Sequence, residues 1–308
     1  MSPIRLALVG LGKIARDQHI PAIAATPGID LVAVASRHAS LEGIAHFVTL
    51  EDLIASGEAI DAVALCTPPQ GRRQLAETAL KAGKHVLLEK PPGATVSELG
   101  PLVAAAREGG RTLFATWHSR HAPAVEPARA FLNENMPRSV TITWKEDVRV
   151  WHPGQRWIFE PGGLGVFDPG INALSILTRI LPRPVFVTAA ELAFPSNCAA
   201  PIAATLALSD AAGLPVRAAF DFLQTGPQTW DITVETDRGV LTLAQGGAVL
   251  SLDGEVISAS PETEYRNIYS RFVDLIDAGR SDVDLAPLQL VADAFLLGRR
   301  TVVAPFHD

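Results

Sequence analysis

The chain has 308 residues, 48% of them apolar and 19% charged, with a formal net charge of −7. This composition is typical of a globular protein, and the lack of a basic cluster argues against nucleic acid as a partner. Without a membrane-length apolar run, a secretory leader, a cysteine framework or histidines at metal-ligand spacing, we expect a cytoplasmic protein with no membrane contact and no metal.

Residues 4–25 predict a buried strand, a glycine turn and a helix. The turn, Gly10-Leu11-Gly12-Lys13-Ile14-Ala15, has the G-x-G-x-x-G/A order of a dinucleotide-binding loop. In such a loop the first glycine allows the tight turn and the second lets the backbone approach a pyrophosphate. The small third residue lets the helix pack closely on its strand.

Short apolar runs alternate with helical segments through the first part of the chain. Further strands are predicted at 31–35, 61–66, 85–88 and 112–116. Strands and helices that alternate with short turns indicate a doubly wound parallel sheet. We therefore expect an α/β protein whose residues 1–120 form a Rossmann dinucleotide-binding domain.

The second predicted strand ends at Ser36-Arg37-His38, the position that faces the adenosine ribose in such a domain. An acidic residue there selects NAD, whereas a basic residue accommodates the 2′-phosphate of NADP. Arg37 can grip a phosphate and stack on adenine, although a simple surface arginine is the alternative. We expect NADP as the cofactor, with NAD also accepted.

Ligands of open parallel sheets bind beyond the carboxyl ends of the strands, so the residues at those ends should converge on one crevice. The candidate cofactor-binding residues are Gly10, Gly12, Lys13, Ile14, Ser36, Arg37, His38, Cys66, Thr67, Pro68, Glu89 and Lys90. His118 follows the fifth strand and is either a substrate ligand or a structural histidine.

Residues 121–308 predict a second, α+β domain. Strand-like runs separated by turns indicate a mostly antiparallel sheet with one face on a core. They lie at 139–150, 185–190, 203–208, 216–222, 230–234 and 240–243. Helices are expected at 172–180, 265–277 and 287–300, and the last of them should pack back on the first domain.

Asp168 and Asn172 are candidate catalytic residues near the start of one helix. Asp168-Pro169 has the form of an N-cap followed by the first helical residue, and Asn172 lies one turn later on the same face. The preceding glycines allow close packing against a ligand. Lys90 precedes two prolines and so is held extended. A positive nicotinamide ring beside it would lower the pKa of its ammonium, so that Lys90 could serve as a proton acceptor or as a hydrogen-bond donor. A capping aspartate and an exposed lysine are the structural alternatives.

Tryptophans are numerous for a chain with 6% aromatic residues. They are Trp117, Trp144, Trp151, Trp157 and Trp230. Core packing explains each by default, but Trp151 and Trp230 have polar neighbours at a loop and a strand start. A flat aromatic face suits the apolar face of a sugar ring.

Taken together, the glycine turn, Glu89-Lys90-Pro91 and the helix opening at Asp168 resemble the Gfo/Idh/MocA family of sugar oxidoreductases. Longer segments resemble its bacterial L-arabinose and D-galactose 1-dehydrogenases. These segments are 13–19, 89–95, 115–120, 144–147, 151–155 and 160–181.

The resemblance implies a Rossmann domain and a second domain with an open antiparallel sheet, through which members often dimerise. It also implies hydride transfer from C1 of a cyclic aldose to NAD(P)⁺, with an aldonolactone as product. L-Arabinose and D-galactose are the expected substrates, and D-fucose is a third. Such sugars differ by one small group, which a pocket discriminates by only about 1–3 kcal/mol.

Position by position, the resemblance makes Lys90 the lysine of the E-K-P motif. Many family members have a histidine base where this chain has Asn172, and an asparagine cannot take a proton at neutral pH. Asp168 is therefore the first choice as proton acceptor and Lys90 the second, with Asn172 orienting the hydroxyl. The implied substrate-binding residues are His118, Glu146, Trp151, Asp168, Asn172 and Trp230.

Two alternatives stay open at this point. One is a dehydrogenase of the same fold for inositol or gluco-configured sugars, against which the missing histidine at Asn172 counts. The other is an NADP-binding sensor without turnover, which would not need Lys90 together with Asp168 and Asn172.

Overall fold

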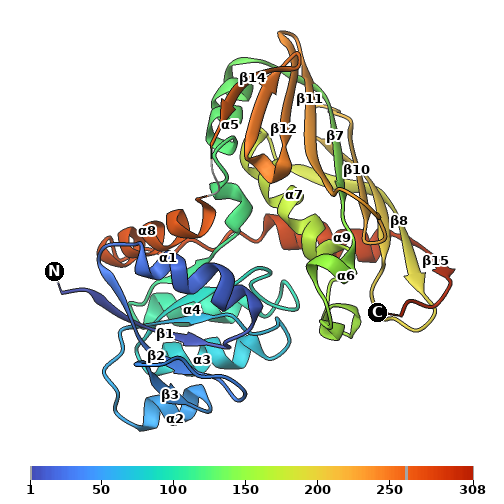
Figure 1. Cartoon of the computed structure of the whole chain (residues 1–308). Helices are drawn as coiled ribbons and strands as arrows, with labels where there is room; N and C mark the ends of the chain where they lie inside the picture. Colours follow the sequence, from blue (N-terminus) through green and yellow to red (C-terminus); the bar gives the residue numbers. More distant parts are fainter. Residues whose placement is uncertain (1, 261–262, 308) are drawn as a thin grey trace. The chain divides into compact units, whose positions relative to one another are not determined.

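The computed structural model describes residues 2–260 and 263–307 (Figure 1). They form two compact units. Unit 1 comprises the chain up to His118 together with Tyr265–Asp284, and unit 2 comprises Ser119–Glu264 and the chain from Leu285 onward. The chain thus leaves unit 1, builds most of unit 2, and returns to unit 1 for one helix.

Unit 1 contains a six-stranded, wholly parallel sheet in the order β3-β2-β1-β4-β5-β6. Its strands are β1 (Ile4–Val9), β2 (Ile29–Ala35), β3 (Ala45–Phe47), β4 (Ala62–Leu65), β5 (His85–Leu88) and β6 (Leu113–Ala115). Most of their residues are buried, as expected for parallel strands covered by helices. This confirms the predicted Rossmann sheet and adds β3, which is too short to show a periodic pattern.

The helical segments of unit 1 are α1 (Ile20–Ala24), α2 (Leu50–Ala55), α3 (Arg72–Lys81), α4 (Leu99–Glu108) and α8 (Glu264–Asp277), with a short π-helix, η1 (Ala15–His19). Helix α8 is the segment that returns. Its Tyr269 and Phe272 share a core with Leu6 and Leu8 of β1 and Ile23 of α1. An apolar stripe on one side of α8 is what this core requires.

Packing of the last helix on the first domain stays a prediction. The last helix, α9 (Ala286–Leu297), belongs to unit 2, where it packs against α7 (Phe167–Ile180) and β8 (Val185–Pro195). Because α9 is apolar around most of its circumference, it suits a buried position between two elements. Helix α8 instead carries one apolar face and a polar one.

Unit 2 is built on a nine-stranded sheet in the order β14-β13-β12-β11-β7-β10-β9-β8-β15. Neighbouring strands are antiparallel except for the pairs β7–β10 and β8–β15. The remaining strands are β7 (Pro137–Lys145), β9 (Ala203–Asp210), β10 (Val216–Asp221), β11 (Thr229–Thr236), β12 (Gly239–Ala244), β13 (Val249–Leu252), β14 (Glu255–Ala259) and β15 (Arg299–Val303). The predicted mostly antiparallel sheet is confirmed.

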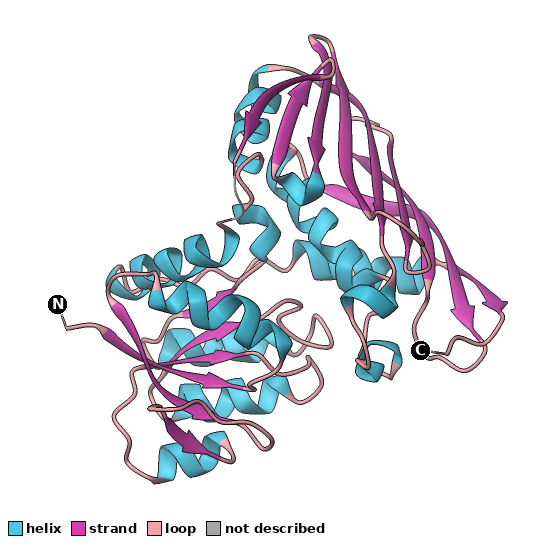
Figure 2. Ribbon diagram, in the orientation of Figure 1, coloured by secondary structure: helices cyan, strands magenta, loops and turns pink. Residues whose placement is uncertain are grey.

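Helices gather on one face of this large sheet (Figure 2). Strand β7 shows the consequence, because Val140, Ile142 and Trp144 are buried while Thr141 and Thr143 face the other way. The other helical segments of unit 2 are α5 (Val125–Glu134), α6 (Val148–Trp151), η3 (Arg156–Phe159) and η4 (Gln245–Gly247). The segment η2 (His118–His121) spans the point where the chain passes from unit 1 to unit 2. No helix among the described residues is long and apolar enough to cross a bilayer.

Candidate active site

The glycine turn of unit 1 lies at a topological switch point of the sheet. Strands β1 and β4 are neighbours, but the chain runs through β2 and β3 between them. Gly10 has φ +91°, and a Cβ there would lie 3.0 Å from Cγ2 of Thr67, so only glycine fits. A Cβ on Gly12 would meet no atom within 4 Å. The open space beside Gly12 fits the approach of a pyrophosphate.

The helix after this turn begins as the π-helix η1 and continues as α1. Single π turns often occur at functional sites. Here the turn ends at His19, whose side chain is completely buried. On the outer side, Lys13 forms an ion pair with Asp17, and Ile14 is 37% exposed. The predicted cofactor-binding pair Lys13 and Ile14 therefore lies at the surface of the turn.

The segment Ser36–His38 follows β2, as expected, and is anchored to β3. The Ser36 N–H donates to the carbonyl of Phe47, and Nε2 of His46 lies 2.9 Å from the carbonyl oxygen of Ser36. The side chain of Arg37 is exposed. A backbone held at two points with an exposed guanidinium is well suited to binding a phosphate.

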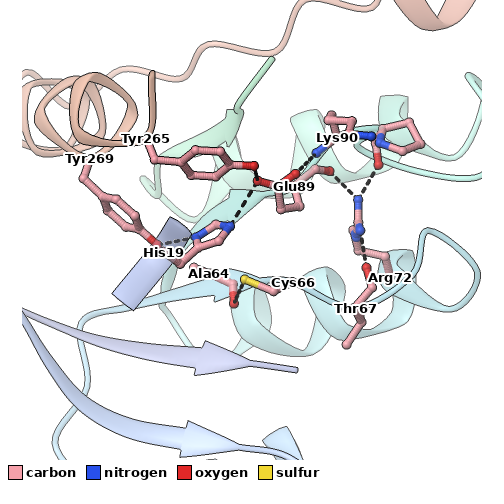
Figure 3. A network of polar contacts seen from close by, with 10 residues as sticks. His19, Ala64, Cys66, Thr67, Arg72, Glu89, Lys90, Tyr265 and Tyr269 are labelled. Atoms are coloured by element: carbon pink, nitrogen blue, oxygen red, sulfur yellow. Dashed lines mark hydrogen bonds and ion pairs between the residues drawn. The ribbon is translucent and has the colours of Figure 1, made fainter. Parts of the chain in front are cut away.

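Glu89 lies buried at the end of β5 and holds the backbone of Lys90 (Figure 3). Its Oε2 accepts the Lys90 N–H at 2.8 Å. Its Oε1 accepts the hydroxyl of Tyr265 at 2.9 Å and lies 3.1 Å from Nε2 of His19. Nδ1 of His19 in turn lies 2.6 Å from the hydroxyl of Tyr269. Two tyrosines of α8 thus complete a polar network around the E-K-P segment.

A second buried group holds the carbonyls on both sides of Lys90. The guanidinium of Arg72, which is 2% exposed, donates to the carbonyl oxygens of Glu89 and Pro91, and also to that of Thr67. Glu89 therefore holds the N–H of Lys90, while Arg72 holds the carbonyls of the residues before and after it. The Lys90 side chain itself is half-buried.

The surroundings of the buried pair His19–Glu89 favour its charged form. Burial opposes charge on His19, but Cys66 and Glu89 outweigh it and raise the pKa of the imidazole to about 10. Burial likewise opposes charge on Glu89, but its hydrogen bond with His19 and nearby positive charge lower the pKa of the carboxyl to about 2. At neutral pH the network therefore holds an imidazolium against a carboxylate.

His118, a predicted substrate ligand, lies in unit 1. Its ring stacks on that of Tyr265, with centroids 5.4 Å apart and an interplanar angle of 22°. One face of the imidazole is therefore covered by the ring of Tyr265. The structure thus connects His118 through Tyr265 to Glu89 and Lys90.

In unit 2, Asp168 is not the N-cap of its helix, which corrects the sequence prediction. The N-cap of α7 is Val166, and Asp168 is the second helical residue. Backbone carbonyls accept the first N–H groups of this helix, with Val166 donating to Pro201 and Asp168 donating to Gly165. Because these donors are already satisfied, the buried carboxylate of Asp168 is not needed as a cap.

Two glycines before α7, Gly163 and Gly165, pack closely against protein backbone. A Cβ on Gly163 would collide with the carbonyl oxygens of Trp157 and Ile158, and one on Gly165 with the carbonyl of Pro201. These close approaches fix the path of the loop into α7 and hence the position of Asp168.

His152 lies between two buried carboxylates. Its Nε2 is 3.2 Å from Oε1 of Glu146, and its Nδ1 is 3.8 Å from Oδ2 of Asp168. The first contact is short but not aligned as a hydrogen bond, so Oε1 of Glu146 has no aligned donor among the described residues. Glu146 and Asp168 are each 2% exposed. This arrangement can accept hydroxyl protons from a polar ligand.

Three tryptophans border Glu146. Nε1 of Trp230 donates to Oε2 of Glu146 at 2.8 Å. The Trp230 ring stacks on Trp144, and Trp151 tilts against it with centroids 4.8 Å apart. Trp144 is buried, whereas Trp151 is 39% exposed. An apolar aromatic surface can pack on the C–H groups of a sugar ring, and the buried carboxylate beside it can accept hydrogen bonds from the sugar hydroxyls.

Asn172 lies one turn after Asp168 on α7 and is half-buried. Unit 2 therefore brings together Glu146, Trp151, Asp168 and Trp230, with Asn172 next on the helix. Unit 1 holds Lys90, His118 and the predicted cofactor-binding residues.

Sequence reasoning missed His152, His19 and Arg72. His152 and Asp168 are 16 residues apart, and His19 and Glu89 are 70 apart. Contacts over such separations leave no spacing signal, because they arise only when the strands and helices pack. The local signal for His152 is its position next to Trp151, a predicted substrate-binding residue.

Comparisons with known proteins agree with this architecture. A family model described as an oxidoreductase family with an NAD-binding Rossmann fold matches residues 4–116. The galactose 1-dehydrogenase of Pseudomonas fluorescens is 50% identical over 308 residues, which is the full length of both chains. The crystal structure of D-galactose-1-dehydrogenase from Rhizobium etli has a TM-score of 0.96 at 59% identity and covers 100% of this chain and 99% of that one.

A more distant solved structure shares the fold alone. A 3-ketoreductase from Actinomadura kijaniata, in complex with TDP-benzene and NADP, is 20% identical with a TM-score of 0.83, covering 98% of this chain and 100% of that one.

Proposed function

The chain belongs to the Gfo/Idh/MocA family of oxidoreductases, and on that premise we propose that it oxidises C1 of D-galactose to the aldonolactone. Its class is that of an NAD(P)-dependent sugar dehydrogenase. The proposal for the sugar rests chiefly on the buried carboxylates around His152, found in a chain that is 50% identical to a galactose 1-dehydrogenase along its full length.

The chemistry of unit 2 supports a sugar as the ligand. Burying a carboxylate oxygen without a donor is costly, and a substrate hydroxyl would supply the donor that Oε1 of Glu146 lacks. The exposed part of Trp151 offers an apolar surface for ring C–H groups. A carboxylate beside an aromatic face is thus suited to a polyhydroxylated ring.

In the proposed reaction the C1–H bond breaks with its electron pair and the O1–H bond releases a proton, leaving the C1=O of a lactone. When bound, the oxidised nicotinamide cofactor supplies the hydride acceptor. Asp168 takes the proton from O1, and the imidazole of His152 beside it receives that proton in turn. Asn172 orients the same hydroxyl through its amide. Lys90 is the alternative proton acceptor.

We propose NADP as the preferred cofactor, with NAD also used. The glycine turn would hold the pyrophosphate, together with Thr67 and Pro68 after β4. Arg37 and Ser36 would hold the 2′-phosphate, since the segment Ser36–His38 contains no carboxylate to reject it.

L-Arabinose and D-fucose are further proposed substrates. They carry the ring configuration of D-galactose and replace its exocyclic CH₂OH by hydrogen and by methyl, respectively. A contact with one such group changes transition-state binding by about 1–3 kcal/mol. Turnover with all three, at different rates, is therefore expected.

The test is the absorbance of reduced cofactor in a grid of D-galactose, L-arabinose, D-fucose, D-glucose and myo-inositol, each with NADP⁺ and NAD⁺. Turnover with the first three and a lactone detected in the product mixture would support the proposal. Preference for D-glucose or myo-inositol would assign a related dehydrogenase. If no sugar is turned over although the cofactor still binds, the proposed activity is refuted and an NADP-binding sensor is favoured.

We also propose that the large sheet of unit 2 mediates a homodimer. Its helix-free face presents small side chains such as Thr141, Thr205 and Ala219, which let two copies approach closely. Light scattering coupled to size-exclusion chromatography should then give twice the mass of 32.7 kDa. Thr205→Arg should give the monomer, and a wild-type monomer would contradict the proposal.

A further inference from the structure

The E-K-P segment is held from both sides by buried groups that the proposed reaction does not use. Glu89 accepts the N–H of Lys90, and Arg72 donates to the carbonyls of Glu89 and Pro91 (Figure 3). The N–H of Lys90 and the carbonyls of Glu89 and Pro91 are therefore each bonded to a side chain that is at most 4% exposed. These buried hydrogen bonds hold the segment more rigidly than the stability of a turn requires.

Glu89 itself is oriented by α8. The hydroxyl of Tyr265 donates to Oε1 at 2.9 Å, and His19 contacts the same oxygen. With Oε1 occupied by these two donors, Oε2 is directed to the N–H of Lys90. Tyr265 is also the first residue of unit 1 after the chain returns from unit 2, and its ring stacks on His118, the last residue before the chain leaves.

We propose that Tyr265 is a positioning residue for Lys90, acting through Glu89 to hold the lysine backbone. The inference deepens the proposed function, on which its catalytic part rests. Tyr265 touches neither sugar nor cofactor in this role. Its hydroxyl fixes the rotamer of Glu89, and Glu89 fixes the peptide that carries Lys90. The segment that returns after unit 2 thereby supplies a part of the lysine site.

Tyr265→Phe is the informative variant, because it removes only the hydroxyl and keeps the ring on His118. Loss of a hydrogen bond to a carboxylate should lower kcat for D-galactose roughly tenfold, since Lys90 samples unproductive positions. The KM for the sugar should stay within about twofold, because Lys90 acts in the reaction step and not in binding. Tyr269→Phe, one contact further from Glu89, should have a smaller effect.

A double-mutant cycle separates positioning from general destabilisation. If Tyr265 acts through Lys90, then Tyr265→Phe in a Lys90→Met background should cause no further loss of kcat. Equal losses in both backgrounds would overturn the proposal. Asp210→Asn is the control: it removes a buried carboxylate that accepts the N–H groups of Ala212 and Leu214. It should lower the melting temperature and leave kcat unchanged.

Hydrogen exchange tests the same contact without catalysis. Pro91 and Pro92 have no amide hydrogens, so a peptide ending there reports Lys90 with little interference. Tyr265→Phe should speed exchange of the Lys90 amide severalfold, and Asp210→Asn should not. Unchanged exchange in Tyr265→Phe would overturn the proposal, even if the wild type oxidises galactose. Faster exchange in a protein that oxidises no sugar would refute the proposed function alone.

Discussion

The Nδ1 atom of His152 lies 3.8 Å from Oδ2 of Asp168, at the point where α7 begins. The opposite nitrogen of the ring faces Glu146. Asp168 is buried, whereas the side chain of His152 is 19% exposed. A proton accepted by Asp168 would thus find a titratable group next to it that reaches toward water. In our proposal, this is how the chain replaces the histidine base that Asn172 cannot provide.

Replacing His152 should therefore impair the reaction step. His152→Asn keeps a polar side chain but cannot bridge Glu146 and Asp168. We expect kcat for D-galactose to fall about 100-fold, the lower range for loss of a proton-transfer group. Binding of NADP⁺, measured by tryptophan fluorescence, should not change. His307→Asn, at an exposed position, is the control. Full activity of His152→Asn would exclude the imidazole from proton transfer.

Asp168→Asn tests the proton acceptor directly. The amide has the size of the carboxylate but cannot take a proton, so kcat should fall by about 10²- to 10⁴-fold with little change in KM. Steady-state rates over a range of galactose concentrations give both values. If Asp168→Asn retains activity while Lys90→Met loses it, the acceptor is Lys90, and the role proposed for Asp168 is wrong.

How far the sequence could predict this protein depends on the range of each contact. The glycine turn and the strands at 4–9 and 85–88 follow from local pattern and agree with β1 and β5. Strand β15 does not follow from a local pattern, because it pairs with β8, whose residues lie more than 100 positions earlier in the chain. The capping role predicted for Asp168 failed for a similar reason, since the carbonyl of Pro201 approaches from another element.

The same distinction applies to the site. Glu146 and Trp230 could be predicted individually, but their hydrogen bond arises only from the pairing of β11 with β7. His19, which pairs with Glu89, is buried at the end of the π turn η1, and no composition rule predicts that turn.

Arg37 should set the preference between cofactors. Its guanidinium is exposed, and the backbone of the preceding residue, Ser36, is held by His46 and Phe47. Arg37→Ala should therefore remove the charge without loosening the loop. Loss of a phosphate contact of about 1.5–3 kcal/mol should raise the KM for NADP⁺ roughly 10- to 100-fold. The KM for NAD⁺ should change less than about threefold. An equal effect on both cofactors would mean that Arg37 does not contact the 2′-phosphate.

The buried imidazole of His19 should make the stability of the protein depend on pH. The pKa of His19 is raised to about 10 in the folded chain, against an ordinary value near 6.5. A raised pKa means that the folded state binds the proton more tightly. The stabilisation is therefore complete below pH 6.5 and is lost as the pH rises toward 10. Because the folded and unfolded states differ by at most one bound proton, the free energy of unfolding should fall by up to about 1.4 kcal/mol per pH unit in that window.

Urea unfolding of the wild type and of His19→Asn at pH 6.5, 7.5 and 8.5 isolates this contribution, because the other titrating groups cancel in the difference. The variant should be the less stable protein at pH 6.5, and the gap should narrow steadily as the pH rises. Parallel pH profiles would show that His19 titrates alike in the folded and unfolded chain. In that case the buried pair with Glu89 is not ionic, and the contact that orients the Lys90 segment is a neutral hydrogen bond.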